Sequence, residues 1–120
     1  MIKKVLSKDE RIKKESKRLK DICENIDKNK MGIAESLISR AAFMRITLED
    51  YEKDLDENGY VELFTQSEKT EPYERERPVA RLYNSMNTNY QKIMKALVDL
   101  LPDEAKGNND SRLQTFTRVR

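Results

Sequence analysis

The sequence predicts an all-α protein built on a long antiparallel helical hairpin with an additional N-terminal basic helix. Apolar residues recur at helical spacing in two long segments, 30–57 and 78–101, which would form rods of roughly 40 and 35 Å. Three Gly and three Pro in 120 residues are too few for a turn-rich β-sandwich. Because a lone hairpin would leave much apolar surface in water, we expect the chains to assemble into a homo-oligomeric ring or bundle.

The chain divides into a basic N-terminal helical segment (1–29), a helical hairpin that forms the oligomerisation core (30–102, with a loop at 60–77) and a flexible basic tail (103–120). A helix over 8–27 is expected because Ser7 precedes Glu10 at capping-box spacing. Asn29 and Gly32 predict a junction before the next helix, and one continuous bent rod is the alternative. The narrow apolar stripe of this first helix is Ile12, Leu19, Ile22, Cys23 and Ile26.

The hairpin segment is bounded by turn residues. Asn58-Gly59 is expected to end the first rod, and Pro78 to begin the second. A kink at Thr47, where Asp50 follows at capping spacing, is an alternative to a straight rod. Residues 60–64 are expected to pack as an extended strip and 65–77 to form an exposed loop. The residues expected to carry oligomerisation are Leu37, Ile38, Ala41, Met44 and Leu48 on the first rod, and Val79, Tyr83, Met86, Tyr90, Ile93 and Leu97 on the second.

The formal net charge of +2 conceals a strong segregation of charge along the chain. Residues 1–20 hold nine Lys or Arg and three Asp or Glu, a net charge of about +6. Residues 47–76 hold eleven acids and three bases, about −8, and the last sixteen residues carry about +3. Such asymmetry indicates charged partners.

The basic N-terminal segment is either a solvated helix face or an arm that binds the phosphates of duplex DNA. Lysine and arginine release condensed counterions from a duplex, which gives affinity without reading sequence. Arg40 and Arg45 form a weaker candidate pair, and the tail arginines Arg112, Arg118 and Arg120 suit a protein as well as a nucleic acid. The candidate DNA contacts of the arm are Lys3, Lys4, Lys8, Arg11, Lys13, Lys14, Lys17, Arg18 and Lys20.

Catalytic chemistry finds little support in the sequence. The chain has no histidine, one cysteine (Cys23) and no glycine-rich phosphate loop, so neither an enzyme nor a cofactor or metal is predicted. The acids Glu49, Asp50, Glu52, Asp54, Asp56 and Glu57 suggest a solvated surface, with a docking face for a basic partner or a hard-cation site as alternatives. No apolar stretch approaches the ~20 residues of a membrane span, and a single cysteine suits a reducing cytoplasm.

Residues 31–102 contain six short motifs: Glu57-Asn58-Gly59-Tyr60, Pro78-Val79, Tyr83-Asn84, Met86, Asn89-Tyr90 and Leu100-Leu101-Pro102. Together these motifs resemble the small terminase subunits of tailed double-stranded-DNA bacteriophages. The resemblance implies a non-catalytic adaptor that forms rings, binds viral DNA and delivers it to the large terminase subunit, which holds the ATPase and nuclease, in the cytoplasm of the infected bacterial host. Many relatives bind DNA through an N-terminal helix-turn-helix, a pattern that this chain does not show.

A second hypothesis comes from a different class of protein. The same amphipathic rods would serve a non-enzymatic helical-bundle protein of structural or interaction type, with no role for nucleic acid. Salt-dependent binding to duplex DNA distinguishes the two hypotheses.

Overall fold

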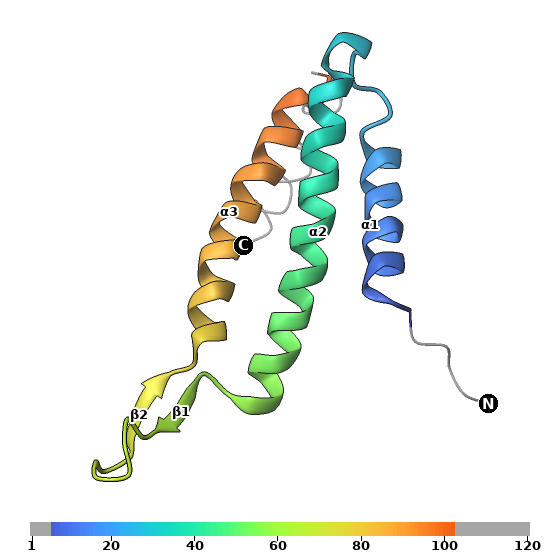
Figure 1. Cartoon of the computed structure of the whole chain (residues 1–120). Coiled ribbons are helices and arrows are strands. Elements are labelled where there is room, and N and C mark those ends of the chain that lie inside the picture. The colour runs from blue at the N-terminus through green and yellow to red at the C-terminus, as the bar shows by residue number, and fades with distance from the viewer. Residues whose placement is uncertain (1–5, 103–120) are drawn as a thin grey trace, which may run out of the picture.

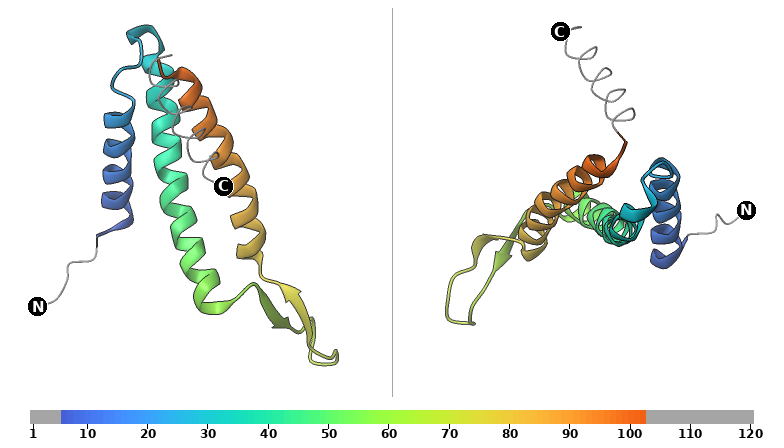
Figure 2. Two further views of the ribbon diagram at one scale, coloured as in Figure 1. Left: turned by 180° about the vertical axis from the view of Figure 1, so that it is seen from behind. Right: turned by 90° about the horizontal axis from the view of Figure 1, so that it is seen from above.

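A computed structural model describes residues 6–102 of the chain. The elements follow in the order α1 (Lys8–Ile22), α2 (Lys28–Asn58), β1 (Val61–Phe64), β2 (Tyr73–Glu76) and α3 (Pro78–Leu100). Helix α2 lies in the middle, with α1 along one side and α3 along the other, and the two strands project from one end (Figures 1 and 2). The predicted helical hairpin is α2 with α3, and the mostly helical class is confirmed.

Helix α1 is docked on α2. Its N-terminus is capped by Ser7, whose hydroxyl accepts a hydrogen bond from the Glu10 backbone N–H at 3.2 Å, as the capping-box spacing predicted. Leu19 is 2% exposed, and Cys23 and Ile26 continue the buried stripe beyond the helix. The helix ends at Ile22, not at residue 27, because the chain turns there toward α2. The separate start of α2 at Lys28 shows that a single bent rod is wrong.

Helix α2 runs uninterrupted for 31 residues, so no new helix begins at Thr47. The helix can contact neighbours on two sides because Ala34, Ala41 and Ala42 are completely buried and small. It ends at Gly59, whose φ of 81° and ψ of 178° lie in a region that only glycine adopts easily.

The connection between α2 and α3 contains a two-stranded antiparallel sheet, which corrects the prediction of a loop over 65–77. Tyr73 packs edge-on against Phe64 with ring centroids 5.9 Å apart. Arg75 lies 3.5 Å from the centroid of the Phe64 ring and pairs with Glu62 at 2.9 Å. These cross-strand contacts stabilise a strand over residues whose charged composition alone predicts an exposed loop.

All three helices contribute to one apolar core, yet the molecule is elongated. Its radius of gyration is 19.6 Å, against about 13 Å for a compact domain of 100 residues. No helix within residues 6–102 is long and apolar enough to cross a membrane. The buried core consists of Leu19, Cys23, Ile26, Ala34, Ile38, Ala41, Met44, Leu48, Tyr90, Leu97 and Leu101.

Candidate nucleic-acid interface

Four lysines of α1 lie on one exposed side of the helix, which also carries the exposed acids Glu10 and Asp21. Lys13, Lys14, Lys17 and Lys20 are all exposed, and the docking of Leu19 against α2 turns their side of the helix toward solvent. Among residues 6–102, no carboxylate oxygen lies within 4.0 Å of any of these four ammonium groups. The face spans about 10 Å along the helix axis. We call these four residues the lysine face.

The two arginines of α1 pair with carboxylates, Arg11 with acids of α2 and Arg18 with an acid of its own helix. Arg11 donates a hydrogen bond to the Asp50 carboxylate on α2 at 2.7 Å and lies 3.8 Å from Glu49. Arg18 forms a two-pronged contact with Glu15, at 2.8 and 2.7 Å. Hydrogen bonding to Arg18 lowers the pKa of Glu15, so the carboxylate stays charged and balances the arginine.

The remaining candidates at the N-terminus occupy different surroundings. The Lys8 ammonium lies 5.1 Å from the centroid of the Phe43 ring on α2, where the aromatic face attracts its charge. Lys3 and Lys4 lie outside the described residues. The lysine face is therefore the part of the predicted arm that the structure brings together on one solvent-facing side.

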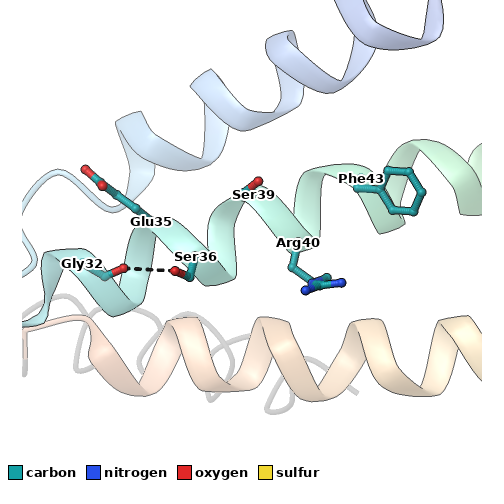
Figure 3. A pocket seen from close by; sticks show the side chains of 6 residues that line it. All are labelled: Gly32, Glu35, Ser36, Ser39, Arg40 and Phe43. Atoms are coloured by element: carbon teal, nitrogen blue, oxygen red, sulfur yellow. Dashed lines mark hydrogen bonds between the residues drawn. The ribbon is translucent and has the colours of Figure 1, made fainter.

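Arg40 and Arg45 do not act as a pair. Five positions on a helix separate two side chains by about 140°. Arg40 lines an open groove on α2 (Figure 3). Arg45 lies beside Tyr90, whose hydroxyl raises the pKa of the arginine. The two charges therefore face different parts of the molecule.

The groove in Figure 3 is shallow and floored by small residues. The Ser36 hydroxyl donates to the Gly32 carbonyl at 3.3 Å, so it is partly satisfied within its own helix. Glu35, Arg40 and Phe43 supply one negative charge, one positive charge and an aromatic ring. Within the described chain no group of three or more His, Cys, Asp or Glu side chains could hold a metal ion.

The acids at the end of α2 are largely engaged with partners. Asp54 accepts hydrogen bonds from Asn58 at 2.7 Å and from Arg77 at 2.9 Å, and these two contacts lower its pKa. Glu52 accepts a hydrogen bond from the Tyr83 hydroxyl at 2.8 Å, which raises the pKa of Tyr83. The acids point to different neighbours and do not converge on one ligand.

The residues expected to carry oligomerisation fall into two groups. Ile38, Ala41, Met44, Leu48, Tyr90 and Leu97 are buried inside a single protomer, where they are inaccessible to a second copy. Leu37, Val79, Tyr83, Met86 and Ile93 are half-buried at the edge of that core. The predicted oligomerisation residues do not include the apolar side chains that remain exposed on the helices: Ile22, Ile33, Phe43, Leu82 and Val98. In the sequence they are indicated only by apolar stripes that are wider than a single helix–helix contact can bury.

Comparison of the chain with protein-family models, with curated proteins and with solved structures found no match. The arguments for function are therefore the lysine face, the exposed apolar side chains and the short motifs of the sequence.

Proposed function

We propose that this protein is a small terminase subunit of a tailed double-stranded-DNA bacteriophage. It acts as a non-catalytic adaptor that binds viral DNA, assembles into a ring and delivers the DNA to the large terminase subunit in the cytoplasm of the infected host. The observation that carries the proposal is the lysine face, together with the resemblance of residues 31–102 to that family.

The docking of α1 supports the DNA-binding part of this proposal. Leu19 in the core and the Arg11–Asp50 contact fix the orientation of the helix before any ligand arrives. Preorganised charges lose little conformational freedom on binding. Lysines on a smooth helix face suit phosphates, and their contacts supply affinity without sequence discrimination.

The exposed apolar side chains support the assembly part. Ile33, Phe43 and Leu82 are each about half exposed or more, although they lie on ordered helices. Packing of a second copy against these side chains would remove their apolar surface from water. Assembly also repeats the lysine face in every subunit, so that several weak contacts act together on one duplex.

Titration of duplex DNA at several salt concentrations tests the proposal. Each phosphate contact adds about 0.9 to the slope of log K against log salt concentration. Replacing Lys13, Lys14, Lys17 and Lys20 with Gln should therefore reduce the slope by up to about 3.6 if every lysine contacts a phosphate. The control carries Lys53→Gln and Lys69→Gln at the acidic end, where exposed lysines lie far along the chain from α1.

The outcomes separate the two hypotheses. An unchanged slope in the fourfold variant would show that the lysine face is not the contact. Failure of the wild-type protein to bind duplex at low salt would favour a helical-bundle interaction protein instead. Point substitutions are preferred to deletion of residues 1–20, because that deletion also removes Leu19 from the core.

A further inference from the structure

The β-hairpin carries exposed apolar residues at the acidic end of the molecule. Leu63 is 74% exposed and Val61 is 53% exposed. They pair across the sheet with Glu74 and Glu76, so these four side chains share one face. Leu82, at the start of α3, is also exposed and lines a groove with Glu76. We call these five residues the hairpin surface.

The hairpin surface combines exposed apolar side chains with glutamates, which favours one kind of partner. A two-stranded hairpin is only marginally stable in water by itself, so covering its apolar face would stabilise it. The opposite face is already covered in part, by Arg75 stacked on Phe64. Glu74 and Glu76 beside the apolar residues favour a ligand that is both basic and apolar. Glu76 is only loosely paired within the chain, with Arg81 at 4.0 Å.

Residues 111–120 of the same sequence have that chemistry. The segment reads SRLQTFTRVR and contains no acidic residue. We infer that this segment of one chain docks on the hairpin surface of a second copy. This inference rests on the assembly part of the proposed function and names the two surfaces that meet. The arginines Arg112, Arg118 and Arg120 pair with the glutamates, and Leu113, Phe116 and Val119 cover the apolar residues.

Chain length argues for a second copy as the partner. Helix α3 has 23 residues, so Pro102 lies about 35 Å from Pro78, and the strands extend about 13 Å farther. Leu113 lies eleven positions after Pro102, and a fully extended chain of that length reaches at most about 40 Å. Within one protomer Leu113 would therefore fall short of Leu63 where α3 and the strands run in line, and only residues nearer the end of the segment, such as Phe116 and Val119, could reach the hairpin surface, whereas a neighbouring copy imposes no such limit.

A contact between the tail of one copy and the hairpin of the next joins two different surfaces. Such heterologous contacts close into a ring when the rotation between subunits allows it, and otherwise grow into filaments. The contact is separate from the lysine face, which lies on α1 on the other side of α2 (Figure 1).

A fluorescently labelled peptide of residues 103–120 tests the inference by anisotropy. The receptor is the full chain carrying Arg112→Glu, Arg118→Glu and Arg120→Glu, whose own tail cannot compete. We expect saturable binding that weakens as salt increases. Adding Val61→Ser and Leu63→Ser to the receptor should weaken binding by about tenfold or more, because the peptide loses its apolar contacts.

The matched control is Ile22→Ser, which removes a similarly exposed apolar side chain from α1. It should leave peptide binding unchanged, and circular dichroism should show native helix content in every receptor. The three arginine substitutions alone should lower the mass of the native particle. The inference is overturned if the peptide does not bind, or if it binds the hairpin variant as tightly as the control. DNA binding that persists in that case would leave the proposed function standing.

Discussion

Replacement of Leu19 by Ala tests whether α1 belongs to the folded core. Leu19 is 2% exposed and is the buried side chain within α1 itself, so its packing is central to the attachment of that helix to α2. Buried Leu→Ala substitutions cost about 2–5 kcal/mol, through lost burial and the cavity left behind. That loss is a large share of the roughly 5–15 kcal/mol that stabilises a typical domain.

Urea denaturation followed by circular dichroism measures the effect. With a slope of about 1–3 kcal/mol per molar urea, the midpoint should fall by roughly 1–3 M. All samples need the same protomer concentration, because assembly would contribute to the measured stability. The control is Ile22→Ala in the same helix, where the side chain is 54% exposed, and its cost should stay within about 0.5 kcal/mol. Equal and small losses in both variants would refute the docking of α1.

Three further predictions concern the free energy of unfolding. Arg11→Ala should cost no more than about 1 kcal/mol in denaturation experiments, because the Arg11–Asp50 pair is partly exposed and screened by solvent; a larger loss would contradict this. Gly59→Ala should lower the free energy of unfolding by about 1–3 kcal/mol, because Gly59 has a φ of 81°. Gly32→Ala lies inside α2 and should be neutral or stabilising by up to about 1 kcal/mol. A larger loss at Gly32 than at Gly59 would refute this account of the backbone. Burial raises the pKa of the Cys23 thiol above its ordinary 9.0. The stabilising contribution of the neutral buried thiol to the free energy of unfolding is therefore complete below about pH 9 and is lost as the pH rises above that value. Cys23→Ala should flatten the alkaline fall in stability, and an unchanged fall would argue against the buried thiol.

The helices were predictable because their signals are local. Apolar periodicity predicts α2 and α3. Local residue chemistry marks three helix ends: Ser7 the start of α1, Gly59 the end of α2 and Pro78 the start of α3. The docking of α1 was not decided by the sequence. Its narrow apolar stripe is compatible with a projecting helix, and only the packing of Leu19, Cys23 and Ile26 against α2 shows that it is part of the core.

The second strand and the charged contacts were beyond local reasoning. Tyr73–Glu76 forms a strand because of partners such as Phe64 that lie nine or more residues away. The role of Arg11 also depends on a distant neighbour, Asp50 on α2, since its position on α1 gives no local sign of that contact. A basic helix therefore suggests a nucleic-acid contact from sequence, but structure is needed to separate charges used in folding from those left for a ligand.

The mass of the native particle, measured by light scattering at tens of micromolar protein, tests most directly the claim that each protomer leaves apolar surface for other copies. The account predicts a mass that is a multiple of 14.2 kDa. It also predicts that adding duplex DNA increases this mass further. A particle of 14.2 kDa under these conditions would contradict the account, because the exposed Ile33, Phe43 and Leu82 would then have no partner to cover them.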